Sequence, residues 1–581
     1  MAVRRGVLLI IVLILAAVVV SATGVIALTL MAGRGPTVTR NSTLVLEISG
    51  DLHEIEPSGV FDQLFEPPPT VRSVTEALRK ARVDTRVSSV VIRPTTSGAL
   101  WAKVQEVRDA IVDFKQSEKP IVAFLEYGGD QAFYLASACD KVFLMPTASL
   151  DLTGLANYEL FLRGTLDKIG AYPDAMHIGD YKTAANTFTE HTMTPAHREM
   201  AQSLNTDLYE QLVRGLAEGR NKSEEEARRL IDHGPYLPED AVRAGLVDDL
   251  AYEDEIDDKV QLGSGEVRYL RQREYRQIPP AALGLNKGQK IAVIYAVGLI
   301  TSGESSNDSA AGDVLGSDTL VRYLRRARAD NTIRAVVLRI DSPGGSAVAS
   351  DVIWREIVLT KEKKPVIVSM SNVAASGGYW IAMPAHAIVA QPGTLTGSIG
   401  VVSIKFVIDG TLKKVGVNME SVSEGRYAEI YSPLRPFSPE ERARMQQLMQ
   451  ATYDTFVEKA ASGRNTTPEK IDAIGQGRVW TGHQAKQLGL VDELGGLDRA
   501  LALAKQRANI PQDAEVELVV YPPKRSLYEM LADPFGRSDQ SGAIAAFLGL
   551  SDRRIVNTLT APLRVFRRGE PLALMPNVFV R

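Results

Sequence analysis

Short runs of apolar residues alternate along most of the chain with longer segments in which apolar residues recur at helical spacing. The runs VVIR, PIVAF and KVFLM in the first half, and VVLRI, PVIVS and AIVAQ in the second, are rich in β-branched residues. Such runs predict buried strands, and the segments between them predict helices. Long amphipathic helices are expected at 196–219 and 440–463, because Thr-Pro or Ser-Pro stands at the start of each. The pattern predicts an α/β protein built from repeated strand–helix units.

The first apolar segment has a different pattern. No charged residue occurs between Arg5 and Arg34, and residues 7–31 are nearly all apolar, which is long enough to span a bilayer. Arg4 and Arg5 precede it, so the N-terminus is expected in the cytoplasm. A cleaved signal peptide is the alternative, but the run exceeds a usual signal core and no A-x-A site ends it. We expect an uncleaved anchor. Whether the segment is an anchor or a cleaved signal peptide, the rest of the chain is expected outside the cytoplasm.

Past this segment the chain repeats itself after about 246 residues, with small gaps. Five pairs of segments occur in the same order: 42–52 with 290–300, 77–93 with 323–339, 119–124 with 364–369, 146–154 with 392–400, and 244–250 with 488–494. A repeat of this length predicts two domains of like fold.

The repeat sets the expected domain boundaries. Residues 1–40 hold the cytoplasmic start, the anchor and a linker, and the two repeats occupy 41–285 and 286–525. A C-terminal tail, 526–581, has apolar and basic stretches that could pack on a neighbour or on the membrane surface.

Composition excludes some classes of protein. The chain has 581 residues, of which 45% are apolar and 23% charged, and its net charge of -4 gives no sign of nucleic-acid binding. Its single cysteine, Cys139, excludes an intrachain disulfide framework. Cys139 could be a nucleophile, but its apolar neighbours favour a core position.

A serine and a lysine distinguish the two repeats. Ser376 lies in 371-SNVAASGGYW-380, and the first repeat has Asp130, or Gly129 if the gap is placed differently, at that position. In the other direction, Lys182 of 181-YKTAA-185 has Ala428 as its counterpart. Each repeat therefore keeps one partner and lacks the other, as expected for a site shared between duplicated domains.

A serine that attacks a carbonyl needs a base close to it. Histidine is the usual base, and the second repeat offers only His386 and His483. Lys182 serves instead if burial lowers its pKa so that the amine is neutral, although a surface lysine is the alternative. The complementary loss makes Ser376 and Lys182 a candidate catalytic pair, and a histidine base stays open as the alternative.

A glycine pair in 340-IDSPGGSAVAS-350 follows the strand AVVLR directly. Glycines at a strand-to-helix junction expose amide groups that can stabilise an oxyanion. An amide of this pair, Gly344 or Gly345, and the amide of Gly377 are the candidate donors. A plain tight turn is the other interpretation, but in the first repeat Ala99 interrupts the glycine pair.

The motifs DSPGGS, AASGGYW, TLTGSIGVV and YKTAA together resemble the long form of the signal peptide peptidase A family. The resemblance covers nearly all of the chain after the anchor. It implies a Clp/crotonase-like fold and a Ser-Lys dyad in which Ser376 is the nucleophile and Lys182 the general base. It also implies that Gly345 and Gly377 are the oxyanion donors, with Gly344 as the alternative to Gly345. It further implies that Ser398 hydrogen-bonds the lysine; the first repeat has Leu152 there. A threonine in YKTAA replaces the family's usual serine.

The resemblance implies a membrane-anchored serine endopeptidase without a cofactor or metal. Its expected substrates are apolar peptides, chiefly remnant signal peptides, and a homo-oligomer is expected, with a tetramer favoured. The expected location is the bacterial cytoplasmic membrane, with the catalytic domains on the extracytoplasmic side. Two alternatives remain: a non-catalytic scaffold that binds apolar peptides, and a crotonase-type acyl-CoA enzyme, for which no CoA-binding signature stands out.

Overall fold

The computed structural model describes residues 38–50, 52–56, 69–95, 100–260, 268–308, 312–523 and 571–576. The expected anchor, residues 7–31, and most of the expected tail lie outside these ranges. Among the described residues no helix is long and apolar enough to cross a membrane.

The first repeat is built on a six-stranded sheet whose order is β8-β5-β3-β2-β1-β9. All of its strand pairs are parallel, as the buried apolar runs predict. The strands are β1 (Ser42–Ile48), β2 (Val87–Pro94), β3 (Ile121–Leu125), β5 (Lys141–Leu144), β8 (Asp249–Leu250) and β9 (Arg268–Arg271). Its helices include α3 (Val71–Val83), α4 (Trp101–Lys115), α5 (Asp130–Ala136), α9 (Glu224–His233), α10 (Pro238–Arg243), α11 (Ile256–Val260) and α12 (Gln272–Arg276).

The second repeat has a sheet of the same plan with the path β20-β18-β16-β14-β10-β22, joined at one side by β17 and β21. These strands are β10 (Gln289–Val297), β14 (Ile333–Ser342), β16 (Val366–Ala375), β17 (Ala387–Ala390), β18 (Leu395–Gly397), β20 (Val479–Thr481), β21 (Glu493–Leu494) and β22 (Val516–Tyr521). The helices are α13 (Ser317–Ala329), α14 (Ala347–Lys361), α15 (Gly377–Ala382), α18 (Pro468–Ile474), α19 (Gly482–Gln487) and α20 (Leu497–Arg507). The predicted pair of tandem α/β domains is confirmed.

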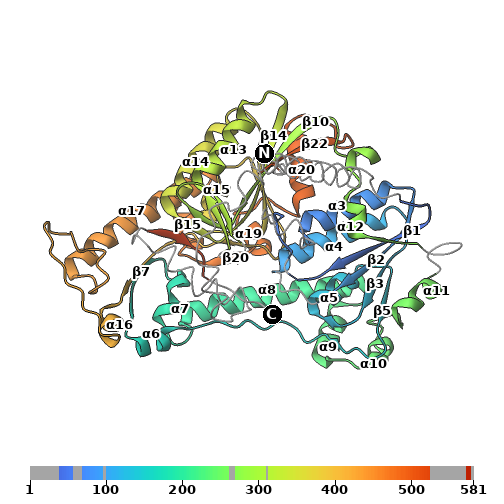
Figure 1. Cartoon of the computed structure of the whole chain (residues 1–581), viewed down its shortest axis with the longest axis horizontal. Coiled ribbons are helices and arrows are strands. Elements are labelled where there is room, and N and C mark those ends of the chain that lie inside the picture. Colours follow the sequence, from blue (N-terminus) through green and yellow to red (C-terminus); the bar gives the residue numbers. More distant parts are fainter. Residues whose placement is uncertain are drawn as a thin grey trace, which may run out of the picture.

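Both predicted long helices are present. They are α8 (Pro195–Gly219) and α17 (Pro439–Gly463), and each begins with a proline. Thr194 caps the first by accepting from the His197 amide, and Ser438 caps the second by accepting from the Glu441 amide. In Figure 1 α8 runs across the lower part of the molecule, from near α7 (Asn186–Thr189) to near α5 of the first repeat.

A third sheet joins the two repeats and includes the C-terminal segment. Its order is β12-β13-β11-β15-β23-β19-β7. The strands are β7 (Tyr172–Ile178), β11 (Leu299–Thr301), β12 (Ser306–Asp308), β13 (Gly312–Gly316), β15 (Gly344–Ser346), β19 (Val401–Val407) and β23 (Leu572–Leu574). β7 belongs to the first repeat in sequence, yet it pairs antiparallel with β19 of the second. Because of this pairing, the residues that follow β7 lie against the second repeat.

Candidate active site

Ser376 lies in a strained turn between a strand and a helix. β16 ends at Ala375, α15 begins at Gly377, and Ser376 between them has φ 55° and ψ -112°. A positive φ is unusual for a residue with a side chain and costs about 1–3 kcal/mol. The Ser376 amide donates to the carbonyl of Gly397 at 2.8 Å, which holds the turn against β18. Neighbouring small residues leave room for this close approach.

Ser398 follows β18 and also has a positive φ, 51°. Its amide donates to the carbonyl of Arg478 at 2.7 Å. Because β18 pairs in parallel with β16, the turns that follow the two strands lie side by side. Ser376 and Ser398 therefore lie next to each other, each just after the end of its strand.

Lys182 approaches from the first repeat, four residues beyond β7. The Tyr181 amide donates to the carbonyl of Gln476 at 2.8 Å, so the loop before β20 holds this backbone. Gly477 of the same loop has φ 77°, and a Cβ there would lie 2.5 Å from the Cβ of Lys182. The loop therefore supports the backbone of the lysine through a position that only glycine fits.

The three predicted side chains meet although they are far apart in sequence. Lys182 Nζ lies 2.7 Å from Ser376 Oγ. The same nitrogen donates to the Ser398 carbonyl at 2.8 Å and lies 3.0 Å from Ser398 Oγ. Lys182 is 1% exposed and the two serines are fully buried. The two contacts to Ser398 direct the amine toward the hydroxyl of Ser376.

The electrostatic surroundings of Lys182 favour the neutral amine. Burial lowers the pKa of Lys182 well below its usual value, and no compensating charge contributes. Lys103 is a useful contrast. Burial also disfavours its charge, but the neighbouring carboxylates of Asp341 and Glu54 outweigh that effect and raise the pKa of Lys103. A neutral Lys182 has a lone pair that can take the proton of Ser376.

The glycine-rich strand β15 lies beside the amide of Gly377. Gly344 cannot easily supply an oxyanion donor, because its amide already donates to Ser342 Oγ at 3.2 Å. A Cβ on Gly377 would lie 3.1 Å from the amide nitrogen of Gly345, so these two residues are in close contact. Gly377 opens α15, where amides have no partner within the helix. The placement favours Gly345 and Gly377 as the donors.

The segment 571–576 lies across this glycine strand. β23 pairs antiparallel with β15, Gly345 opposite Ala573, and also with β19, Val402 opposite Leu572. The Met575 amide donates to the carbonyl of Pro343 at 2.9 Å. The sequence analysis left the role of the tail open and did not predict a strand here.

The apolar side chains of this segment enter clusters on both sides of the dyad. Leu572 packs with Ala184, Ala185, Phe188, Val402 and Ile404. Met575 packs with Met200, Leu204, Val373, Ala375, Leu395 and Val479. An extended apolar hexapeptide therefore lies next to both predicted oxyanion glycines.

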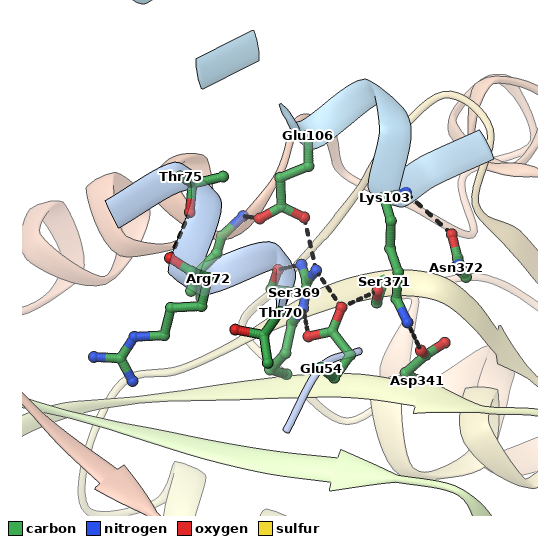
Figure 2. Close-up of polar contacts among 12 residues, drawn as sticks. Glu54, Thr70, Arg72, Thr75, Lys103, Glu106, Asp341, Ser369, Ser371 and Asn372 are labelled. Carbon is green, nitrogen blue, oxygen red and sulfur yellow. Dashed lines mark hydrogen bonds and ion pairs between the residues drawn. The ribbon is translucent and has the colours of Figure 1, made fainter. Parts of the chain in front are cut away.

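A buried ionic network supports the strand that leads to Ser376. Arg339 on β14 donates to both Glu54 oxygens at 2.9 Å and to Glu106 of α4 at 2.7 Å. Lys103 pairs with Asp341 at 2.8 Å, as Figure 2 shows, and Asp341 in turn accepts from the Val373 amide at 3.1 Å. The network therefore joins the two repeats at Val373, three residues before Ser376.

The two histidines considered as bases have other partners. His386 Nδ1 accepts from the Val366 amide at 3.0 Å. His483 Nδ1 lies 2.8 Å from Asp207 of α8. Cys139 is buried, and burial raises the pKa of its thiol, which favours the core position over a nucleophilic role.

Sequence reasoning missed the parts of the site that surround the dyad. Gly477 and the Arg339 network gave no signal in the sequence, since one is a single glycine in a loop and the other depends on one arginine within a strand. The pairing of β7 with β19 could have been suspected, because a lysine of one repeat must reach a serine of the other.

Comparison with known proteins decides the family. A profile of peptidase family S49 matches residues 113–265 and 359–511, one stretch in each repeat. The chain belongs to peptidase family S49. It is 37% identical over 503 residues to the chloroplastic serine protease SPPA of Arabidopsis thaliana, covering 85% of this chain and 73% of the relative. It is 34% identical to protease 4 of Salmonella typhi, over 84% and 78% of the two chains. The resemblance found in the motifs is confirmed, and the S49 chain is a serine peptidase.

Solved structures show weaker similarity. A membrane-bound stomatin-specific protease, 1510-N, is 18% identical with a TM-score of 0.27, over 41% of this chain and 99% of its own. ClpP1 from Listeria monocytogenes is 17% identical with a TM-score of 0.22, over 36% and 94%.

Proposed function

We propose that this S49 peptidase is a membrane-anchored endopeptidase that uses a Ser376–Lys182 dyad to cleave apolar peptides outside the cytoplasm. One observation carries the proposal: a fully buried lysine without a counter-charge lies 2.7 Å from the hydroxyl of a serine in a strained turn. Such a pair is the arrangement that an activated serine nucleophile requires.

The geometry supports a two-step acyl transfer. Neutral Lys182 takes the proton of Ser376 as Oγ attacks the peptide carbonyl, and the amides of Gly345 and Gly377 stabilise the resulting oxyanion. The Lys182 ammonium then gives that proton to the leaving amine as the carbon–nitrogen bond breaks. Water attacks the acyl-enzyme with Lys182 again as the base, and Ser376 recovers its proton. Ser398 holds the amine in position throughout.

The position of β23 supports a binding mode for the substrate. A peptide that takes its place would form an additional strand between β15 and β19, with its backbone hydrogen-bonded to the oxyanion strand. The pockets that hold Leu572 and Met575 are apolar, so apolar side chains are expected at the matching substrate positions.

This binding mode predicts that the C-terminal segment competes with substrate. Deleting residues 571–581 is expected to lower KM for an apolar peptide several-fold with little change in kcat. A synthetic PLALMP peptide should then inhibit the shortened enzyme competitively. If KM is unchanged and the peptide does not inhibit, substrate binds elsewhere.

Membrane anchoring, location and assembly complete the proposal. The uncharged segment 7–31 after Arg4 and Arg5 supports a single-pass anchor in the bacterial cytoplasmic membrane, with the catalytic domains outside the cytoplasm. A relative in Enterococcus faecium, 31% identical over 39% of this chain and 67% of its own, is named a putative signal peptide peptidase SppA. That name supports remnant signal peptides as the substrates. A homo-oligomer, with a tetramer favoured, belongs to the same proposal.

Peptide hydrolysis tests the proposal directly. The full chain in detergent micelles would be assayed on an apolar signal-peptide fragment as wild type, Ser376→Ala and Lys182→Ala, with circular dichroism as the folding check. Both variants are expected to lose at least roughly 10³-fold in kcat/KM. A wild type without activity on apolar peptides would favour the non-catalytic scaffold. An active Lys182→Ala would mean that another base serves.

A further inference from the structure

Strand β16 bulges shortly before Ser376. Ile340 of β14 pairs with Met370 of β16. The next paired positions are Ser342 and Ala374, so between the two pairs β14 has one residue and β16 has three. A bulge bends its strand, leaves the extra residues without ladder partners and commonly aims a side chain next to an active site. The shape of this bulge therefore affects where Ser376 lies.

Groups of the first repeat hold two of the three bulge residues. Ser371 Oγ donates to Glu54, and Asn372 Oδ1 accepts from the Lys103 amide at 3.0 Å. Lys103 lies in the first turn of α4, where Leu100 provides no side-chain cap, so Asn372 of the second repeat satisfies this amide. Figure 2 shows both contacts.

Asp341 holds the third bulge residue. Its Oδ1 accepts from the Val373 amide at 3.1 Å, and its Oδ2 lies 2.8 Å from Lys103 Nζ. Asp341 also stands four positions before Gly345, near the end of the strand that leads to this proposed oxyanion donor. One carboxylate therefore links the turn of Ser376 and the glycine strand to one lysine of the first repeat.

The side chains of this ion pair are each present in one repeat. Helices α4 and α14 have equal lengths and begin 246 positions apart, so Ala349 is the counterpart of Lys103. At the same spacing Thr95 is the counterpart of Asp341. Neither repeat can form this ion pair alone. The pair is therefore divided between the repeats in the same way as the serine and lysine of the candidate dyad.

The ion pair is shielded from water at the point where it controls the bulge. The side chains of Lys103 and Asp341 are 9% and 14% exposed. At such burial a charge-assisted contact is strong and little screened, so the ammonium fixes the orientation of the carboxylate. Val373 begins the pairing of β16 with β18, and Ser376 follows three residues later. A shift of Val373 therefore moves the strand end that carries Ser376.

We propose that Lys103 is a positioning residue: through Asp341 it holds the bulge of β16 in the shape that presents Ser376 to its base. The proposal rests on the dyad proposed above and gives the first repeat a second role, since this repeat then shapes the serine turn as well as supplying Lys182. A displacement of the reacting groups by about 1 Å costs up to roughly 100-fold in rate.

Steady-state kinetics of Lys103 variants tests the proposal. Full-length wild type, Lys103→Met and Lys103→Arg would be assayed in detergent micelles on one apolar peptide. We expect Lys103→Met to lose roughly 10- to 100-fold in kcat and to change KM by less than about two-fold, because the geometry of attack is altered and the apolar pockets are not. Lys103→Arg keeps the charge and should recover part of the lost kcat.

Lys80 provides the matched control. It is a buried lysine of the first repeat, 1% exposed, and its Nζ donates to the carbonyls of Tyr275 at 2.7 Å and Ile278 at 3.0 Å. Lys80→Met therefore removes buried hydrogen bonds within the first repeat, and it should lower the thermal unfolding midpoint but keep the kcat of wild type. If Lys103→Met loses no more kcat than Lys80→Met, the positioning role is overturned.

Fluorophosphonate labelling of Ser376 measures the serine turn without a bound peptide. The labelling rate should fall in Lys103→Met in proportion to kcat and recover in part in Lys103→Arg. If Lys103→Met does not fold, Asp341→Asn replaces it, since this variant removes the charge opposite Lys103 but keeps an acceptor for the Val373 amide. Asp341→Asn should lose kcat in the same direction, and a wild-type kcat would overturn the role.

The outcomes separate this role from the proposed function. An active wild type together with an equally active, equally labelled Lys103→Met overturns the positioning role and leaves the dyad intact. A wild type that neither hydrolyses peptide nor is labelled at Ser376 overturns the proposed function, and the role of Lys103 with it.

Discussion

The two repeats have the same strand–helix plan but differ at the positions of the proposed catalytic residues. Ser376 occupies a strained turn beside a lysine whose pKa burial lowers, whereas its counterpart Asp130 accepts from the amides of Thr153 at 3.2 Å and Gly154 at 3.0 Å. Lys182 is buried at the second repeat, whereas its counterpart Ala428 is on an exposed arm. The first repeat keeps the lysine and the second keeps the serine. The two residues still meet, because β7 of the first repeat pairs with β19 of the second.

A second contrast concerns arginines at matching strand positions. Arg339 is 1% exposed between Glu54 and Glu106, and its counterpart Arg93 lies at the surface near three exposed glutamates. The Coulomb attraction of Arg339 and Lys103 outweighs the effect of burial and lowers the pKa of Glu54. The same sequence position therefore joins the repeats in one copy, and in the other it forms ion pairs within its own repeat.

The largest effect is expected at Lys182. Lys182→Met keeps the length of the side chain but removes the base, so kcat/KM should fall by roughly 10³-fold or more while stability is retained or increased. Ala428→Lys, the matched change in the other repeat, should leave activity unchanged because no serine faces it. Peptide hydrolysis and thermal unfolding check both variants. If Lys182→Met stays active, Lys182 is not the base, and the proposed division of the dyad between the two repeats is wrong.

The arginine contrast predicts unequal losses of stability. Arg339→Met removes the arginine between two buried carboxylates and leaves only Lys103 to attract Glu54, so it should cost about 3–5 kcal/mol, whereas Arg93→Met should cost less than about 1 kcal/mol. The measurement is the thermal unfolding midpoint of each full-length variant. Equal shifts for the two variants would show that the buried network contributes no more than a surface ion pair. Adding Glu54→Gln and Glu106→Gln should recover part of the loss in Arg339→Met.

Ser398→Ala should have a moderate effect. It removes one contact to the amine but keeps the carbonyl contact, so we expect a loss of roughly 10- to 100-fold in kcat with little change in KM. Ser398→Thr, which keeps the hydroxyl, should recover part of the activity. Steady-state kinetics on one apolar peptide measures both. A loss confined to KM would indicate that Ser398 contacts the substrate instead.

Asp130→Asn should have the smallest effect, and it depends on pH. Burial raises the pKa of the Asp130 carboxyl from 3.8 to about 6 in the folded chain. The folded state therefore binds the proton more tightly, and the contribution of Asp130 to stability falls as pH rises from about 4 through 6. The stability difference between Asp130→Asn and wild type should change by about 2 kcal/mol over that range. Unfolding midpoints at pH 4 and pH 7 test this, and a pH-independent difference would contradict it.

Periodicity was sufficient to predict the strand–helix units and the two long helices, because those elements depend on local patterns of burial and on their capping residues. The repeat and the complementary residues led to Ser376 and Lys182, and the family resemblance led to Ser398; the structure places the three side chains together. The pairing of β7 with β19 was beyond local patterns, since an edge strand can pair with any partner that the fold brings near. The same holds for β23, which pairs across more than 200 residues of sequence. Arg339 and Arg93 have similar sequence surroundings, so only tertiary contacts separate them.

The most direct test of the shared dyad is the pH dependence of covalent labelling of Ser376. A fluorophosphonate probe would be applied to the full-length wild type and to Lys182→Met, with mass spectrometry to identify the labelled residue. Because burial lowers the pKa of Lys182, the neutral amine forms on raising the pH through that lowered value. Wild-type labelling should therefore rise through one ionisation below the usual lysine pKa and be nearly absent in Lys182→Met. Labelling of Ser376 at the same rate in both proteins would contradict the account.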